Sequence, residues 1–161
     1  MKNLKAVKTT PYKIKMKDNT PVTSKPYPLT IKQRELVKKI LDDLESSGVI
    51  SRANSPWSSP AFIKVKKSTG EGRPLVNYKK VNKQIQGNSN SAPRISTVIE
   101  AVGEGRIFSS IGLISSYFQF QIEEGSRDVT AFKFEGMPVY RFNSLPPVSY
   151  THLTLPTIYS V

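Results

Sequence analysis

The chain has 161 residues, 37% of them hydrophobic and 22% charged, and this length suits one modest core in a single domain. It carries 24 Lys and Arg against 12 Asp and Glu, a formal net charge of +12, which favours a polyanionic partner. Charge alone does not distinguish a protein that binds a polyanion from one that is simply basic. The absence of cysteine excludes disulfides, thiolate metal sites and cysteine nucleophiles.

Residues 1–26 form a basic segment rich in Thr and Pro, which we interpret as a lead-in to the domain. Lysines are spread through it without the continuous apolar stretch of a signal peptide, and no run in the chain reaches the length of a membrane span. We therefore expect an intracellular protein without a membrane partner. The weak alternation from Tyr12 to Met16 favours at most an edge strand, with no part in the core.

The first strong element is a helix predicted at residues 31–47. Thr30 and Gln33 match a capping box, in which each side chain satisfies an amide of the first turn. Apolar residues then recur at helical spacing as one stripe, and Gly48 supplies the helix end. The members of the stripe are Leu36, Val37, Ile40, Leu41 and Leu44. We expect this helix to serve in packing.

A β-hairpin is predicted next. The string SPWSSP at residues 55–60 forces an extended, irregular path, and its Trp57 is typical of a packing residue. Residues 61–66 then alternate between apolar and mostly basic side chains, residues 68–72 form a turn, and residues 73–78 make a second strand. The hairpin therefore has a basic rim, whose lysines are solvated charges unless a ligand uses them.

The second half of the chain predicts one helix and a smaller sheet. Residues 93–102 repeat apolar side chains on one helical face, and we expect a scaffold helix behind the following strand. A short strand before Gly112, a strand at residues 119–122, a turn at 123–126, and a hairpin from 130–134 and 139–142 follow. Helices that accompany antiparallel strands in this order indicate an α+β fold.

Several of these motifs resemble, in the same order, the reverse transcriptase domain of gypsy-type LTR retrotransposon Pol polyproteins. FSSIGLISSYFQFQI at residues 108–122 matches the palm motif of that family, SPWSSP matches its fingers segment, and RPLVNYKKVN at residues 73–82 matches a further motif of the fingers. The resemblance covers residues 27–146 and implies a partial right-hand polymerase fold, with fingers plus an incomplete antiparallel palm sheet. Residues 147–161 do not match the family, which suggests a frameshift or junction near Pro146.

The resemblance implies substrate-binding roles for four residues. Lys66 and Arg73 match hairpin cations that grip the triphosphate of the incoming nucleotide, and Lys67 is an alternative to Lys66. The chemistry suits them, since Lys is a mobile point charge and Arg can fork across phosphate oxygens. Tyr117 matches the residue that packs under the sugar, and Gln119 matches an active-site support. A core aromatic and a hydrogen bond at a strand end are the structural alternatives for these two.

One position departs from the family pattern where the chemistry depends on it. Nucleotide polymerisation needs two divalent metals, and Mg²⁺ prefers oxygen ligands. The family supplies an aspartate in the palm motif and a pair in a later Y-x-D-D hairpin, but Gly112 occupies the first position and no Y-x-D-D occurs in the chain. We do not expect Glu123, Glu124 or Asp128 to replace them, because they follow the next strand. The resemblance thus implies RNA-directed DNA polymerase activity, with Mg²⁺, for the family, and a catalytically defective chain here with no metal site.

The expected partners also follow from the resemblance: an RNA template, an RNA/DNA hybrid, dNTP and the remainder of the Pol polyprotein. Two alternatives stay open. One is a non-catalytic nucleic-acid-binding module that uses the basic fingers. The other is a chain that does not fold stably, because a palm sheet without its later strands would leave an open edge and an uncovered apolar face.

Overall fold

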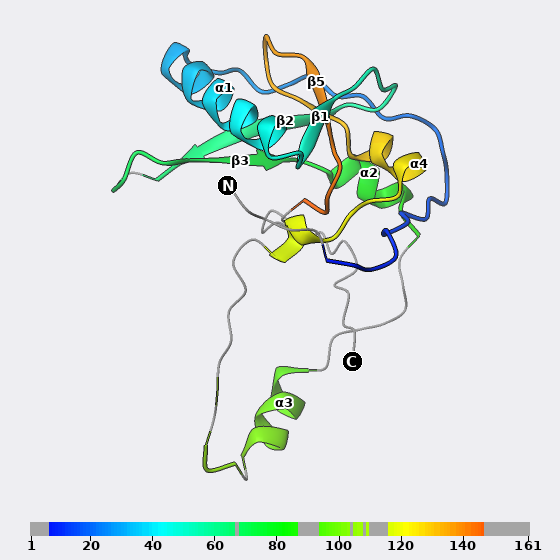
Figure 1. Cartoon of the computed structure of the whole chain (residues 1–161), viewed down its shortest axis with the longest axis vertical. Coiled ribbons are helices and arrows are strands. Elements are labelled where there is room, and N and C mark those ends of the chain that lie inside the picture. Colours follow the sequence, from blue (N-terminus) through cyan, green and yellow to red (C-terminus); the bar gives the residue numbers. More distant parts are fainter. Residues whose placement is uncertain are drawn as a thin grey trace.

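The computed structural model describes residues 7–66, 68–86, 94–103, 105–107, 109 and 116–146. Helices and one mixed sheet make an α+β fold, so the fold class predicted from the sequence is confirmed (Figure 1). In chain order the elements are α1 (Ile31–Ser46), β1 (Ile50–Arg52), β2 (Ser59–Val65), β3 (Gly72–Val76), α2 (Lys79–Gln84), α3 (Ile95–Val102), η1 (Ser116–Gln119), α4 (Glu124–Arg127), η2 (Asp128–Thr130), β4 (Phe132–Lys133) and β5 (Val139–Phe142). Among the described residues, no helix has the length and apolar character needed to cross a membrane.

Helix α1 forms as its sequence predicts. The Thr30 hydroxyl accepts a hydrogen bond from the Gln33 amide at 3.3 Å, and the Gln33 side chain accepts one from the Thr30 amide at 3.0 Å, which completes the capping box. Gly48 follows the helix with φ 71°, a conformation that glycine adopts without steric cost. The apolar stripe faces the sheet, since Val37 and Leu41 are almost fully buried.

The sheet has five strands in the order β1-β5-β4-β2-β3. Neighbouring strands are antiparallel except β2 and β4, which run parallel with Ser59 opposite Phe132. The predicted finger hairpin and palm strands therefore belong to one mixed sheet, whereas the sequence predicts an antiparallel palm sheet. The difference arises because a long crossover joins β2 to β4, and only such a connection allows a parallel pair.

The two faces of the sheet carry separate cores. On the α1 side, the Phe132 ring lies 5.0 Å from the Phe142 ring and 6.1 Å from the Tyr140 ring, between centroids. The residues next to these in sequence point to the opposite face, where a second cluster packs around Trp57. Trp57 is buried, as predicted for a packing residue.

Residues 7–25, here called the N-terminal strap, contribute to the main core. Ile14 is only 7% exposed, and Tyr12 and Met16 pack beside it while each makes an isolated β-bridge to a later segment of the chain. The prediction that this segment has no part in the core was therefore wrong. Within the strap, Tyr12, Ile14 and Met16 alternate with lysines at 13, 15 and 17, so one side can cover the core while the lysines stay in solvent.

The region after α3 differs in part from the prediction. The predicted strand at 119–122 is instead η1 followed by single bridges, and the predicted turn at 123–126 is largely the short helix α4. The predicted last hairpin is confirmed as β4 and β5, with Gly136 at φ 70° in its turn. Helix α2, which directly follows β3, was not predicted.

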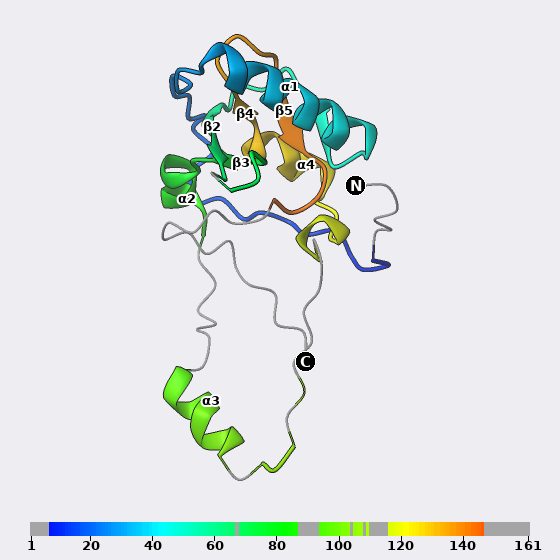
Figure 2. The same cartoon turned by 90° about the vertical axis from the view of Figure 1, so that its left-hand side faces the viewer.

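Helix α3 forms where it was predicted, but most of the strand that it was expected to support lies outside the described residues. Figures 1 and 2 both show it apart from the sheet and α1. Consistent with this position, Ile99 is 65% exposed and Val102 is 44% exposed.

Candidate functional site

The finger hairpin turns one face toward α1 and the other toward solvent. Ile63 and Leu36 of α1 approach Gly72 so closely that a Cβ on this glycine would lie 2.5 Å and 2.7 Å from their methyl groups. Because side chains alternate along a strand, the residues next to Ile63 and Gly72 point to the other face. Lys64 and Arg73 are those residues, and they lie directly opposite each other in the β2–β3 register.

Lys66 lies one residue beyond the end of β2, where the hairpin begins to turn. Its amide donates to the Glu71 carbonyl at 2.9 Å, and its carbonyl accepts from the Gly70 amide at 2.8 Å. The Lys66 amide thus still bonds to the opposite arm of the hairpin, while its carbonyl belongs to the turn, so this exposed lysine lies where the face of Lys64 and Arg73 meets the turn. The structure therefore brings the predicted pair Lys66 and Arg73 together on one exposed hairpin, while the alternative Lys67 lies outside the described residues.

The electrostatics of this face favour an anion. Lys64 and Arg73 are like charges directly opposite each other, an arrangement that destabilises a sheet unless an anion lies near them. Within the described part of the chain, neither residue nor Lys66 takes part in an ion pair. The nearby Glu71 carboxylate accepts a hydrogen bond from the Thr69 hydroxyl at 3.2 Å. A phosphate group would suit the three cations chemically.

An aromatic pair borders the same face. Phe62 precedes the cations on this side of β2, and its ring meets Tyr27 edge-on with 5.5 Å between centroids. The Tyr27 hydroxyl in turn accepts a hydrogen bond from the Asn77 amide group at 2.9 Å. Sequence reasoning missed Lys64, Phe62 and Tyr27 as site residues. Strand alternation is the signal for the first two, but the position of Tyr27 depends on tertiary structure.

The predicted palm residues lie on a different element. Tyr117 is on η1 and is 44% exposed, and Gln119, which is half-buried, accepts a hydrogen bond from the Val7 amide through its carbonyl at 2.9 Å. Gly112, the position of the family aspartate, lies outside the described residues. In the ranges that are described, no hydrogen bond or ion pair joins Tyr117 or Gln119 to the hairpin cations.

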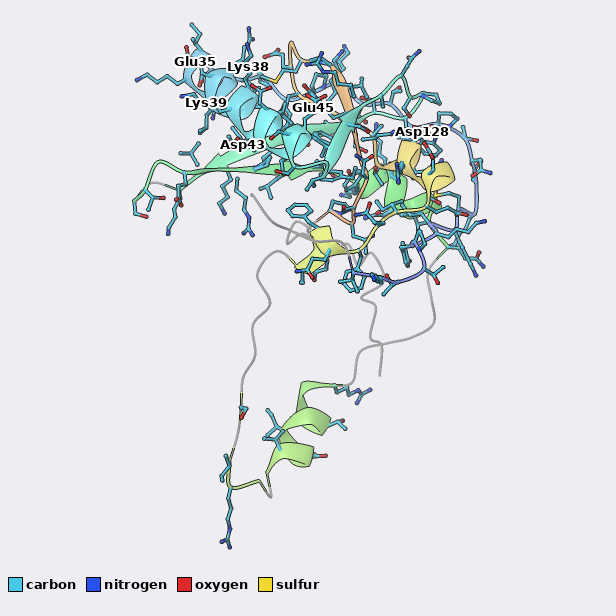
Figure 3. All side chains as sticks on the ribbon, viewed as in Figure 1. Glu35, Lys38, Lys39, Asp43, Glu45 and Asp128 are labelled. Atoms are coloured by element: carbon cyan, nitrogen blue, oxygen red, sulfur yellow. The ribbon has the colours of Figure 1, made fainter. Side chains whose placement is uncertain are left out.

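The acidic residues after η1 are paired with cations. Glu123 lies 3.7 Å from the Lys13 ammonium, and Arg141 lies 3.7 Å from Glu124 and 2.8 Å from Asp128, which Figure 3 labels. Considering only described residues, no group of three or more His, Asp or Glu side chains is placed to hold a metal ion. Carboxylates that each face a cation do not fit Mg²⁺, which requires several oxygen ligands directed at one point.

A cavity of about 40 Å³ lies between α1 and the sheet. Its lining is apolar apart from the polar end of Tyr78, and it includes Leu41 and Phe132. Because no charged group reaches it, this cavity is a gap in core packing and not a phosphate site.

Comparison of the sequence with known proteins identifies polyproteins of transposons and viruses. The chain is 29% identical over 138 residues to the Retrovirus-related Pol polyprotein from transposon 412 of Drosophila melanogaster, and 29% identical over 138 residues to that from transposon gypsy. It is 32% identical over 137 residues to the Enzymatic polyprotein of Soybean chlorotic mottle virus. These matches cover 83%, 83% and 82% of the chain, but only 11%, 13% and 19% of the respective polyproteins. No protein-family model matches the chain.

Comparison of the fold gives a consistent result. The crystal structure of the native Prototype Foamy Virus Protease-Reverse Transcriptase matches with a TM-score of 0.72 and 27% identity, over 88% of this chain and 19% of that protein. Its CSH mutant matches with a TM-score of 0.77 and 24% identity, over 89% of this chain and 19% of that protein. The sequence relatives and the shared fold show that the chain belongs to the reverse transcriptase family of gypsy-type retrotransposon Pol polyproteins.

Proposed function

We propose that residues 27–146 are the fingers and partial palm of a retrotransposon reverse transcriptase that retains a phosphate-binding hairpin but does not synthesise DNA. In the proposal the N-terminal strap packs against this unit as part of its core, and residues 147–161 lie outside it. The observation that carries it is the exposed hairpin face, where Arg73 lies directly opposite Lys64 and Lys66 follows in the adjoining turn. Among the described residues, no acidic side chain is ion-paired to these three cations.

The ligand of this hairpin is proposed to be the triphosphate of a dNTP. Arg73 can donate two parallel hydrogen bonds to phosphate oxygens, and Lys66 supplies a mobile charge from the turn. Tyr117 and Gln119 would contact the sugar side of the nucleotide. Solved foamy virus protease-reverse transcriptases have been determined in complex with double-stranded DNA, and this supports a nucleic-acid partner for the same fold here.

We infer the loss of DNA synthesis from the carboxylates that the chain lacks. RNA-templated polymerisation needs metal-bound carboxylates, but Gly112 has no side chain to offer and the chain contains no Y-x-D-D. The nearest later acids are already ion-paired with Lys13 and Arg141, which supports the view that they do not replace the missing ligands.

A primer-extension assay tests this part of the proposal. The purified chain is incubated with a primed RNA template, Mg²⁺ and dNTPs, and an active reverse transcriptase on the same template serves as the positive control. We expect no extended primer from this chain. Template-dependent extension that disappears when the RNA is omitted would overturn the proposed loss of activity.

Calorimetric titration with dTTP at low salt tests the hairpin separately. Removing one charged donor to a phosphate costs about 1.5–3 kcal/mol, so Arg73→Ala should weaken binding by about tenfold or more. Arg52→Ala is the matched control, because β1 and β3 are the two opposite edges of the sheet and the exposed Arg52–Glu45 pair contributes little to stability. Equal affinities for the two variants would remove the hairpin from the proposal.

A non-catalytic nucleic-acid-binding module is the second candidate function. The formal net charge of +12 favours it, since this function needs basic residues but no metal ligands. It predicts binding to an RNA/DNA hybrid that weakens steeply as salt rises. Absence of binding at low salt, or affinity that does not change with salt, would exclude it.

A further inference from the structure

The turn of the finger hairpin carries an exposed hydroxyl group, that of Thr69. The turn is closed by backbone hydrogen bonds from the Lys66 amide to the Glu71 carbonyl at 2.9 Å and from the Gly70 amide to the Lys66 carbonyl at 2.8 Å. Figure 1 shows it at the outer end of the hairpin, where β2 and β3 extend beyond the rest of the sheet. An enzyme can therefore reach Thr69 without disturbing the core.

The Thr69 hydroxyl is hydrogen-bonded to Glu71. It donates to the Glu71 carboxylate at 3.2 Å and accepts from the Glu71 amide at 3.4 Å. Glu71 is the residue that faces Lys66 across the hairpin, and it lies two positions before Arg73 in the sequence. The hydroxyl oxygen of Thr69 is therefore fixed close to the hairpin cations, and a charged group attached to this oxygen would enter their field.

The segment around Thr69 is strongly basic. Residues 64–73 contain four basic residues and one acid, a net charge of +3. Within the part of the chain that the structure describes, no ion pair neutralises Lys64, Lys66 or Arg73. A phosphate ester carries a charge of about −1.5 to −2 at neutral pH and three acceptor oxygens. One phosphate group on the turn would thus offset most of this positive excess.

We propose that Thr69 is a phosphorylation site for a protein kinase with an acidic substrate groove, and that its phosphate occupies the cationic face of the hairpin. Lys66 lies three residues before Thr69 and Lys64 lies two residues further upstream, so charge complementarity can guide such a kinase to this segment. The turn opens by rearrangement of residues 66–71, because its closing hydrogen bonds lie within them.

The transfer step is an ordinary phosphoryl transfer. The Thr69 hydroxyl oxygen attacks the γ-phosphorus of ATP and forms the new P–O bond, while the bond from this phosphorus to the bridging oxygen breaks and ADP leaves. The hydroxyl proton passes to a carboxylate of the kinase. The products are phosphothreonine and ADP, and no oxidant or reductant is required.

The modification converts the hairpin from an open anion site to an occupied one. The phosphate and the Glu71 carboxylate repel each other, so the hydrogen bond between the two side chains is lost and the phosphate turns toward the cations. Arg73 can donate two parallel hydrogen bonds to it, and the flexible stem of Lys66 lets the ammonium group follow. A phosphate tethered there has an effective concentration of about 1 mM or more and competes with phosphate ligands from solution. Only this competition rests on the nucleotide-binding role proposed for the hairpin.

Kinase treatment followed by peptide mass spectrometry tests the site. The purified full chain is incubated with Mg²⁺, ATP and the catalytic subunit of cAMP-dependent protein kinase, which selects basic residues ahead of its acceptor. We expect phosphate at Thr69 and a loss of most incorporation in Thr69→Val. Thr97→Val is the matched control, because Thr97 is also exposed and follows Arg94 by three residues. Absence of incorporation, or faster incorporation at Ser68 or Thr97 than at Thr69, would overturn the assignment.

Phosphorus NMR against pH tests whether the phosphate lies among the cations. A free phosphothreonine loses its second proton near about pH 6, and neighbouring positive charge favours the dianion and so lowers this pKa. One unit charge about 6 Å away in water changes a pKa by about half a unit. We therefore expect a pKa lower by about half a unit or more in the folded protein than in the same protein unfolded in urea. Arg73→Ala should reduce this difference, whereas Arg52→Ala on β1 should leave it unchanged. Equal pKa values in the folded and unfolded protein would overturn the contact.

Calorimetric titration with dTTP separates this inference from the proposed function. The unmodified chain should bind dTTP, and the chain phosphorylated at Thr69 should bind it at least about tenfold more weakly until a phosphatase removes the group. Equal affinities of the two forms would show that the phosphate does not occupy the nucleotide-binding face. If neither form binds dTTP, the nucleotide-binding role of the hairpin fails, and the phosphorus NMR result still decides whether the phosphate contacts the cations.

Discussion

Replacing Ile14 by Ala tests whether the N-terminal strap is part of the folded core. Ile14 is 7% exposed and belongs to the main apolar cluster, and its amide donates to the buried Ser126 hydroxyl at 3.1 Å. The substitution removes three carbon atoms, and at about 0.8 kcal/mol for each buried carbon this loses about 2.4 kcal/mol. A cavity term adds to it, and Ile→Ala changes in cores cost about 2–5 kcal/mol. We expect about 2–3 kcal/mol, because the strap lies at the margin of the core.

Urea unfolding followed by circular dichroism measures the difference. Lys15→Ala, one position away on the solvent side, is the matched control and should change the free energy of unfolding by less than about 0.5 kcal/mol. Ser126→Ala removes the acceptor of the Ile14 amide and should cost about 1–3 kcal/mol by itself. If Ile14→Ala and Lys15→Ala have equal effects, the strap does not pack as described and the reasoning fails.

Three further substitutions test features of the core and the helix ends. Thr130→Val leaves the Phe142 amide without its acceptor at 2.9 Å, and urea unfolding should show a loss of about 1–3 kcal/mol. Burial raises the pKa of Tyr78 well above its ordinary value of 10.0, so the folded state keeps a proton that the unfolded chain loses. Its contribution to stability should be fully present below about pH 10 and decline above it, and in Tyr78→Phe this decline should be absent from the unfolding free energy measured against pH. Gly48 has φ 71°, so Gly48→Ala should lower stability by about 1–2 kcal/mol, whereas Gly125→Ala in α4 should not.

For each of these substitutions, one outcome would contradict the structural explanation. Thr130→Ser keeps the hydroxyl and should be more stable than Thr130→Val; the reverse order would mean that the hydrogen bond to Phe142 is unimportant. Parallel pH curves for wild type and Tyr78→Phe above pH 10 would show that the hydroxyl is not buried. Equal losses at Gly48 and Gly125 would show that the positive φ of Gly48 is not the cause of the loss.

Local sequence signals were sufficient for the elements that depend on neighbouring residues. The capping box at Thr30 and the apolar stripe predicted α1 almost to its last residue, and alternation placed Ala61 and Ile63 on the buried face of the finger hairpin. The prediction for the strap was wrong because the burial of this segment depends on partners far away in the sequence, such as Ser126. The sequence of a weakly alternating basic segment is the same whether the folded protein buries its apolar side or leaves it in solvent.

For the candidate site, too, sequence signals identified individual residues but not the contacts that depend on tertiary structure. Arg73 and Lys66 were predicted by motif, and both lie on the exposed hairpin, Arg73 in β3 and Lys66 one residue beyond β2, while their binding role stays a prediction. The position of Lys64 opposite Arg73 needed the register of the two strands, which the sequence does not define to a single residue. The contact of Tyr27 with Phe62 needed the path of the strap across the sheet, and no local pattern contains that information.

The parallel pairing of β2 with β4 has a consequence for how quickly the protein folds. Ser59 meets Phe132 across nearly half the chain, so the sheet is complete only after a long connection has closed. Such non-local pairing slows folding, because the entropy of loop closure is lost before the contacts form. The cost grows slowly with length, at about 0.6 kcal/mol for each doubling.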